Sequence, residues 1–535
     1  MKRVIAIFAF SGLSLLAGAG AEVRVAPKPN ILFIAIDDLK PLLGSYGADW
    51  IKSPAMDRLA ARGTVFLANY CQAPLCAPTR ASLLTGLRPD STGIYFNPSK
   101  MNGKNILRVH LPDVVTLPQY FKKNGYATVA MGKVFDSRTV DEGHDAVSWS
   151  RPFVREHKFA HGDPGVRGYQ NPETKRRLSE ATRNRPDKGE PGPPTEGEDV
   201  SDDAYFDGAM ALTAVREIEN LAKQSQPFFL AVGFNKPHLP FIAPKKYWDL
   251  YDRNSLPLAA FQQWPAGSPE IAQIIARGEA RSYEGVPKRG QKGGFSEDLQ
   301  RQLLHGYAAC ASYVDAQLDL LLRTLEQAGV ADNTIICLWG DHGYHLGEHG
   351  HWAKSTTFED ATRAPLIIYA PGVGKGVRTT SLTEFLDVYP TLCELAGLPL
   401  PGHLQGKSLV PLMRNPSARL HESVFSQEST IDSQIGLQLI DGLLDEEGTR
   451  GGINSPMGWA LRTPRYRYVE WRDAVVTGKE HVFGSKPIAI ELYDYDKDPL
   501  ERENLAGKVE YQKVLQEQQE LFDRKLSYLP KRSPE

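Results

Sequence analysis

Short apolar runs that end abruptly in polar residues recur along the chain. The run at 30–36, NILFIAI, shows no polar alternation and therefore predicts a strand that is buried on both faces. Strands of this kind occur in parallel sheets that helices cover on both sides. Similar runs predict further strands at 126–131, 227–234, 333–339 and 365–369.

Between these strands, apolar residues recur at helical spacing. The longest such segment, 296–327, is followed by Gly329, a residue type that commonly ends helices. Strands that alternate with helices predict an α/β fold with a mixed, largely parallel central sheet flanked by helices. The other predicted helices lie at 113–125, 203–223 and 385–396.

The pattern changes after about residue 415. Aromatic residues alternate through 459–471, a short strand is predicted at 488–495, and an amphipathic helix at 511–526 closes the chain. We therefore predict a main domain at 22–415 and a smaller α+β subdomain at 416–535, which holds a small antiparallel sheet and the terminal helix.

One internal segment lacks any apolar periodicity. Residues 163–203 are rich in Pro, Gly and charged side chains. This composition predicts a long surface excursion that borders the functional site. The basic, glycine-rich stretch at 281–294 is likewise interpreted as a loop rather than a binding patch.

The N-terminus has the features of a secretory signal. Lys2 and Arg3 precede an apolar run at 4–16 and small residues that end at Ala21. The apolar run is too short to anchor the chain stably in a bilayer. We therefore assign residues 1–21 to a signal peptide and expect an exported protein, periplasmic or secreted, that is free of the membrane after cleavage.

Composition limits the kinds of partner. The 535 residues carry a net charge of −2, which gives no reason to expect nucleic acid or a membrane surface as the main partner. The cysteines number five, so in an exported protein at least one is unpaired or modified. Cys310, Cys337 and Cys393 lie in apolar segments and are predicted core residues.

The stretch from Cys76 to Gly86, CAPTRASLLTG, is the one placed for reactivity. Pro78 suits the first turn of a helix, so we predict a short helix over 78–85 that Gly86 ends. A helix N-terminus presents free amides and partial positive charge, so an anion held beside Cys76 would face Arg80 one turn later. Taken alone, the same residues also fit the N-terminus of an ordinary helix that begins with a small buried cysteine.

Polar residues follow four of the predicted strands. Taken singly, an acid after a strand can be a helix cap, a lysine can be a solvated surface residue, and a histidine can be structural. Because the carboxyl ends of parallel strands share one edge of a sheet, their recurrence predicts a common site there. The residues are Asp37 and Asp38, Lys133 and Asp136, Lys236 and His238, and Asp341 and His342.

The acids at these strand ends predict a cation site. Asp37, Asp38 and Asp341 supply hard oxygen ligands that suit Ca²⁺ or Mg²⁺. Nearby histidines would also allow Zn²⁺, but zinc sites draw mostly on His and Cys, so we favour Ca²⁺. His238 is a reasonable general acid for a leaving alcohol. The oxygens of an anionic substrate would be bound by Arg80, Lys133, Lys236 and Lys354.

These motifs resemble those of the type I sulfatases, within the alkaline phosphatase superfamily. The resemblance extends over essentially the whole mature chain, and it implies an alkaline phosphatase-like fold. The variants GKVF, FFLAVGFNKPHLPF and GDHGYHLGEHGHWAK are similar to iduronate-2-sulfatases and their bacterial relatives. The motifs that carry the resemblance are CAPTR at 76–80 with LTG at 84–86, Asp37-Asp38, Gly132-Lys133, Lys236-Pro237-His238, Asp341-His342-Gly343, GEHG at 347–350, Lys354 and ELYDYDKDP at 491–499.

The resemblance implies a mechanism. Cys76 would be oxidised by a separate maturation enzyme to formylglycine, whose hydrate attacks the sulfate ester of a sulfated saccharide such as a glycosaminoglycan. His238 would protonate the departing alcohol, while Arg80, Lys133 and Lys354 would hold the formylglycine and the sulfate. By the same match, one Ca²⁺ ion would be bound by Asp37, Asp38, residue 76, Asp341 and His342.

One position departs from the family pattern. The family usually has a histidine three residues after the Gly-Lys lysine, where this chain has Asp136. Asp136 could still accept a proton in the elimination step, or Asp136 and Arg138 could shape a different sugar pocket; His144 is a further substitute. Two other functions stay open: a phosphodiesterase or phosphonate monoester hydrolase of the same superfamily, and a non-catalytic protein that binds sulfated glycans.

Overall fold

The fold was analysed on a computed structural model of the chain. The structure describes residues 28–97, 105–155, 168–184, 191–275, 279–288, 294–429, 453–454, 456–477 and 480–527. The proposed signal peptide at 1–21 therefore lies outside the described residues. Within the described part, no helix is both long and apolar enough to cross a membrane.

A seven-stranded sheet forms the centre of the molecule, in the order β10-β2-β9-β8-β1-β6-β4. Four neighbouring strands are parallel: β8 (Thr334–Gly340), β1 (Asn30–Ile36), β6 (Phe228–Phe234) and β4 (Ala127–Gly132). β9 (Leu366–Tyr369) runs antiparallel to both β8 and β2 (Thr64–Phe66), and β10 (Val377–Thr379) pairs in parallel with β2. The prediction of a mixed, largely parallel sheet is confirmed.

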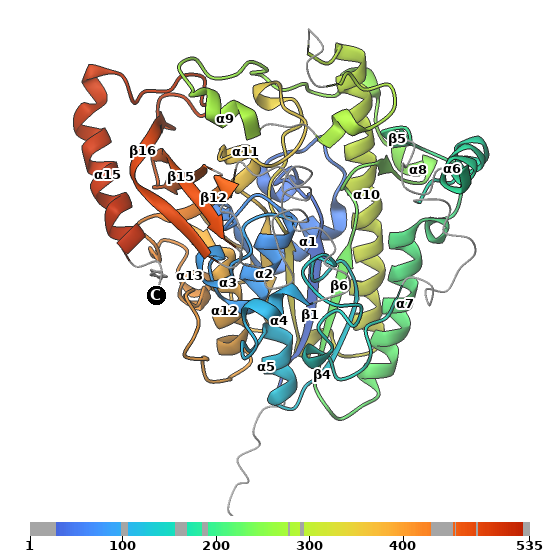
Figure 1. Cartoon of the computed structure of the whole chain (residues 1–535). Helices are drawn as coiled ribbons and strands as arrows, with labels where there is room; N and C mark the ends of the chain where they lie inside the picture. The colour runs from blue at the N-terminus through green and yellow to red at the C-terminus, as the bar shows by residue number, and fades with distance from the viewer. Residues whose placement is uncertain are drawn as a thin grey trace, which may run out of the picture.

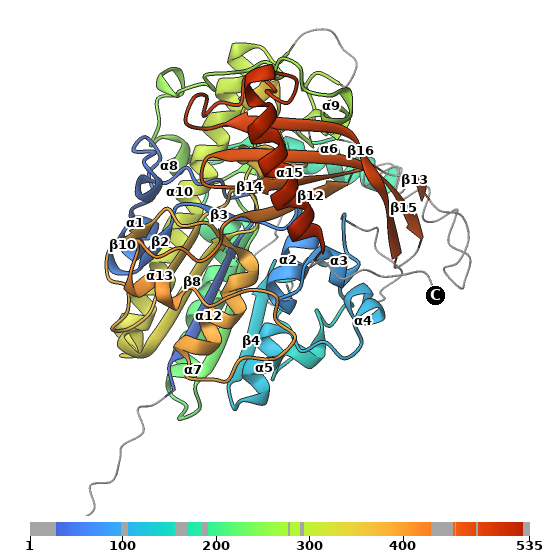
Figure 2. The ribbon, with the colours of Figure 1, turned by 90° about the vertical axis from the view of Figure 1, so that its left-hand side faces the viewer.

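Helices cover both faces of this sheet (Figures 1 and 2). Every residue of β1 is buried, as the unbroken apolar run predicts, because its alternate side chains enter two different cores. One core packs against α2 (Cys76–Thr85), α5 (Leu117–Lys123) and α12 (Val388–Leu395). The other packs against α1 (Pro54–Arg62), α7 (Phe206–Ala222) and α10 (Glu297–Gln327).

The described parts of the segment at 163–203, which are residues 168–184 and 191–203, contain regular elements that the sequence pattern did not predict. It contains α6 (Pro172–Asn184) and β5 (Thr195–Glu196), which pairs in parallel with β7 (Phe241–Ile242). The Asn171 side chain caps the helix by accepting a hydrogen bond from the Thr174 amide at 3.0 Å. Arg176 forms ion pairs with Glu173 and Glu180 along the helix. Such a helix is supported by capping and charge pairs rather than by an apolar face, so apolar periodicity could not reveal it.

The C-terminal part forms a second, antiparallel sheet. β12 (Val424–Ser429), β14 (Met457–Arg462), β15 (Tyr466–Thr477) and β16 (Glu480–Asp494) pair in sequence, and α15 (Gln512–Ser527) packs beside them (Figures 1 and 2). The aromatic stretch at 459–471 supplies two of these strands. The strand predicted at 488–495 begins earlier than expected, since β16 follows β15 through register shifts near Trp471 and Arg472.

The C-terminal sheet holds the loop that follows β8. His349 forms a hydrogen bond to the Leu500 carbonyl at 3.1 Å. Arg467 is almost fully buried, where it pairs with Glu501 and donates to the Thr357 hydroxyl at 3.3 Å. A buried ion pair of this kind fixes its partners firmly, because separating them would leave a charge without compensation.

The remaining elements are short. They include β3 (Asn69–Tyr70), α3 (Pro89–Thr92), α4 (Ile106–His110), α8 (Lys245–Trp248), α9 (Glu270–Ile275), the 3₁₀ turn η6 (Glu279–Ser282), α11 (Glu359–Thr362), β11 (Thr383–Glu384), the 3₁₀ turn η9 (Phe385–Asp387), α13 (Val410–Arg414) and β13 (Ile453–Asn454), besides further 3₁₀ turns.

A glycine allows β6 to approach the end of β4 closely. A Cβ atom added at Gly233 would overlap the backbone of Lys133, which donates a hydrogen bond from its amide to the Gly233 carbonyl at 2.8 Å. Gly233 therefore helps to set the position from which Lys133 leaves the sheet.

We expect Gly233→Ala to lower the free energy of unfolding by roughly 1–3 kcal/mol, because the new methyl group has to displace backbone rather than a flexible side chain. Denaturant unfolding measures the effect. Gly402→Ala is the matched control: it lies in open space and should change stability by less than about 0.5 kcal/mol. Equal stability of the two variants would contradict the role given to Gly233.

Candidate active site

The strand register brings the predicted site residues to one edge of the sheet. Ile36 pairs with Gly340 of β8 and with Phe234 of β6, and Gly132 pairs with Gly233. The residues that follow these strand ends therefore leave the sheet side by side. This juxtaposition confirms the expectation drawn from polar residues after buried strands.

Two of the strand-end acids are each bound by a lysine. Asp37 accepts a hydrogen bond from Lys133 at 2.6 Å, and Asp38 accepts two from Lys354 at 2.7 and 3.0 Å. Burial alone would raise the pKa of Asp37, but Lys133, His238 and Arg80 hold this pKa well below its ordinary value. Asp37 is therefore a carboxylate at neutral pH.

Arg80 crosses the site from α2. Its side chain is fully buried and donates hydrogen bonds to Asp37 and to Asp341, both at 3.1 Å. The guanidinium also donates to the backbone carbonyls of Lys133 and Val134. A planar guanidinium with several fixed donors suits such a position, because it links two acids and the end of β4 at once.

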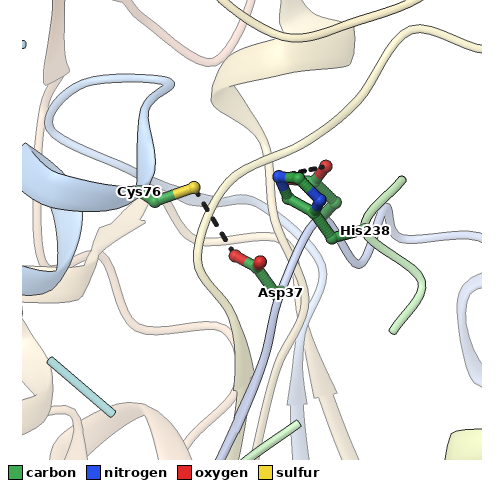
Figure 3. Close-up of side chains that lie close together, drawn as sticks. Asp37, Cys76 and His238 are labelled. Carbon is green, nitrogen blue, oxygen red and sulfur yellow. Dashed lines mark hydrogen bonds and ion pairs between the residues drawn. The ribbon is translucent and has the colours of Figure 1, made fainter. Parts of the chain in front are cut away.

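Cys76 is the first residue of α2, two residues earlier than the predicted helix start, and Gly86 ends the helix as expected. The thiol is 1% exposed and lies 3.5 Å from Asp37 Oδ1 and 3.4 Å from His342 Nε2. Burial and the charge of Asp37 raise the pKa of Cys76 well above its ordinary value. The thiol is thus protonated, and the thiolate suggested by the helix start alone is disfavoured. Figure 3 shows Cys76 facing Asp37, with His238 beside them.

The donor set can hold a hard cation. His342 Nε2 lies 3.5 Å from Asp38 Oδ1 and 3.6 Å from Asp341 Oδ1. Two ligands at right angles, each about 2.4 Å from a calcium ion, are separated by about 3.4 Å, so these spacings fit. Nδ1 of His342 donates to the Gly343 carbonyl at 2.8 Å, which leaves the Nε2 lone pair directed at the acids.

His238 lies beside this cluster on the far side from α2. Its Nδ1 donates to the Leu239 carbonyl at 2.6 Å, so Nε2 faces the site, 3.9 Å from Asp38 Oδ2. Burial would lower the pKa of His238, but Asp38 and Glu279 raise it above the ordinary histidine value. The ring therefore keeps its proton to higher pH, which suits a proton donor.

Glu279 lies in the site, although the sequence pattern did not predict it there. Its carboxylate lies 3.2 Å from His238 Nε2 and 3.2 Å from Lys354 Nζ. Glu279 belongs to η6, in a stretch without apolar periodicity or a recognisable motif, so no sequence signal could have identified it.

Lys236 does not join the anion-binding group that the sequence predicted. Its ammonium donates to the carbonyls of His238 and Pro240 at 2.8 and 2.6 Å. It therefore holds the turn after β6, and burial lowers its pKa.

Asp136 is paired within its own turn. It is buried, and both carboxylate oxygens accept hydrogen bonds from Arg138, at 2.8 and 2.6 Å. Burial alone would raise the pKa of Asp136, but the Arg138 guanidinium holds it well below the ordinary value. A carboxylate so stabilised is a weak base, so this geometry favours the pocket-shaping alternative over proton acceptance. The His144 ring stacks on Phe153 with centroids 3.7 Å apart.

Known proteins resemble this chain over most of its length. A family model described as Sulfatase matches residues 29–398. Among curated proteins, the chain is 32% identical to iduronate 2-sulfatase of Mus musculus, over 89% of this chain and 90% of that protein. It is 33% identical to a sulfatase of Formosa agariphila, over 91% of this chain and 85% of that protein. A solved structure of a putative sulfatase from Bacteroides thetaiotaomicron aligns with a TM-score of 0.65 at 25% identity, over 94% and 93% of the two chains.

Removal of the Arg80 side chain should be strongly destabilising. Arg80→Ala leaves Asp37 and Asp341 buried without the guanidinium, so we expect a loss of about 3–5 kcal/mol in the free energy of unfolding. Chelator-treated protein should be compared, so that a bound cation does not mask the effect. Arg58→Ala removes an exposed ion pair with Asp319 and should cost less than about 1 kcal/mol. Similar losses in both variants would be inconsistent with a central role for Arg80.

Proposed function

The chain belongs to the sulfatase family, and we propose that it removes sulfate from a sulfated saccharide by means of a formylglycine formed from Cys76. It is therefore a sulfatase by family, and the proposal concerns its substrate and chemistry. The observation that carries the proposal is the position of Cys76, at the start of a helix and between Asp37 and His342. Beside it, Lys133 forms an ion pair with Asp37, and Lys354 forms one with Asp38.

The names of the relatives support a saccharide as substrate. One is named iduronate 2-sulfatase and another Delta 4,5-hexuronate-2-O-sulfatase, and the chain matches both over most of its length. We take from them the class of substrate, a sulfated saccharide of the glycosaminoglycan kind.

Maturation would require a second protein. Conversion of Cys76 replaces the CH₂–SH group by an aldehyde, so a formylglycine-generating enzyme must supply an oxidant and remove sulfur. Because Cys76 is 1% exposed in the folded chain, that enzyme has to reach it before α2 packs against the sheet.

When present, the formylglycine hydrate supplies one hydroxyl that attacks sulfur and a second whose deprotonation expels the sulfate and restores the aldehyde. Lys133 and Lys354, with Arg80 behind them, place positive charge where the sulfate oxygens gain charge. His238 donates the proton from Nε2 to the oxygen of the departing alcohol. Its Nδ1 bond to the Leu239 carbonyl keeps Nε2 directed toward that oxygen.

We further propose that one calcium ion completes the site. Three carboxylates, the His342 imidazole and an oxygen at residue 76 form a mostly hard donor set. When bound, the ion would neutralise the strand-end acids and polarise the sulfate group. Its ligands would be Asp37, Asp38, residue 76, Asp341 and His342.

The protein is proposed to act outside the cytoplasm. The charged, apolar and small-residue pattern at 1–21 is that of a signal peptide, which directs export to the periplasm or the medium. The maturation enzyme would then act on the unfolded chain, before the chain folds in the periplasm or the medium.

The proposed chemistry is tested by peptide mass and by hydrolysis rates. Cleavage with trypsin yields residues 63–80, which contain both Cys71 and Cys76. After alkylation we expect Cys71 to carry the thiol label and residue 76 the mass of an aldehyde. The purified protein should hydrolyse an aryl sulfate, and Cys76→Ala should lower kcat/KM by at least about 1,000-fold, because the nucleophile is lost.

The control and the contrary outcomes are distinct. Cys393→Ala, at a buried cysteine in the α12 core, should retain most of the activity. A dominant rate on an aryl phosphate diester would instead support the phosphodiesterase alternative. An unmodified thiol at residue 76 together with binding of sulfated glycans but no turnover would support the non-catalytic alternative.

Calcium removal should lower both stability and activity. A ligand at 100 times its Kd stabilises the folded state by about 2.7 kcal/mol, so added Ca²⁺ should raise Tm measurably above that of the chelated protein. Asp341→Asn should abolish this shift. Asp332→Asn, at an exposed acid near the start of β8, should leave it intact. An unchanged Tm on chelation of the wild-type protein would argue against the site.

A further inference from the structure

The carboxylate of Glu279 lies between two residues that have different expected roles. One of its oxygens faces His238, the proposed proton donor to the leaving alcohol, and the other faces Lys354, which is expected to bind sulfate. The Glu279 side chain is 31% exposed, although its Oε2 atom is buried. The sugar atoms next to the ester oxygen would lie between those two groups, against Glu279.

Glu279 is charged in this position. Burial alone would raise its pKa, but His238 and Lys354 hold that pKa well below the ordinary glutamate value. An ionised carboxylate only accepts hydrogen bonds. It can therefore bind a hydroxyl of the substrate, and it repels a second anionic group.

Glu279 also pairs with cations that could otherwise attract an anionic group of the substrate. His238 and Lys354 both face its oxygens, and Lys133 faces Asp37. Arg138, the half-buried cation of the neighbouring turn, is engaged by both oxygens of Asp136. Among the residues that the structure describes, each of these cations beside Cys76 already has an acidic partner. An anionic substituent on the sugar would therefore have to compete with Glu279 for His238 and Lys354.

We propose that Glu279 is a specificity-determining residue, which selects a sugar with a hydroxyl next to the sulfate ester and disfavours one with a carboxylate or second sulfate there. This inference rests on the proposed sulfatase function and narrows its substrate to a sulfated neutral sugar.

The test compares two matched sugars. One is a 4-O-sulfated hexuronoside, whose carboxylate is attached to the ring carbon next to the one that carries the sulfate ester, and the other is the same pyranoside with CH₂OH in place of the carboxylate. For the wild-type enzyme we expect kcat/KM to be roughly tenfold higher on the neutral sugar, since two like charges at close range repel. In Glu279→Gln the ratio should fall toward one, mainly because KM for the uronoside decreases.

The ratio separates specificity from general damage. A loss of kcat through poorer positioning of His238 would affect both sugars alike and leave the ratio unchanged. Glu284→Gln, at an exposed acid of the same segment that pairs with Arg177, should keep the wild-type ratio. An equal or higher wild-type rate on the uronoside, or the same ratio in Glu279→Gln, would overturn the proposal. Failure to hydrolyse even an aryl sulfate would overturn the proposed function itself.

Discussion

Mutual repulsion between buried acids is the constraint around which this molecule is built. Asp37, Asp38 and Asp341 lie together at one edge of the sheet, almost without contact with water. Such a group is stable only when cations compensate it, and in this chain Arg80 and Lys354 do so from distant parts of the sequence. These ion pairs also hold the helix that begins at Cys76 and the loop after β8 against the sheet. The contacts that balance the charge of these acids are therefore the same contacts that position the proposed catalytic residues.

Much of this arrangement could be predicted because buried parallel strands have a simple signature. The unbroken apolar runs located four adjacent strands, and the polar residues after them located the site. β2 and β10 have three residues each, too few for a pattern to appear. α6 depends on capping and charge pairs, which apolar periodicity does not register. Glu279 could not be predicted, because only the folding of a segment without motifs brings it to His238.

The neighbourhood of Cys76 combines a shared core with local differences. The acids, Arg80 and the two lysines form the part that the family motifs imply. Asp136 and Glu279 add carboxylates beside Arg138, His238 and Lys354. Both lower the positive charge of the outer part of the site. Lys354 also pairs with Asp38, so Glu279 connects the proposed sulfate site with the proposed sugar site.

The contacts of Arg467 and Leu500 with the loop after β8 bear on the order of events during synthesis. These residues would be synthesised and exported long after Cys76, and the loop that carries Lys354 gains its full support only when they join the fold. Until then the loop after β8 is not fully supported, and the site around Cys76 is incomplete. A maturation enzyme would have that interval in which to act, and the last-made part of the chain would end it.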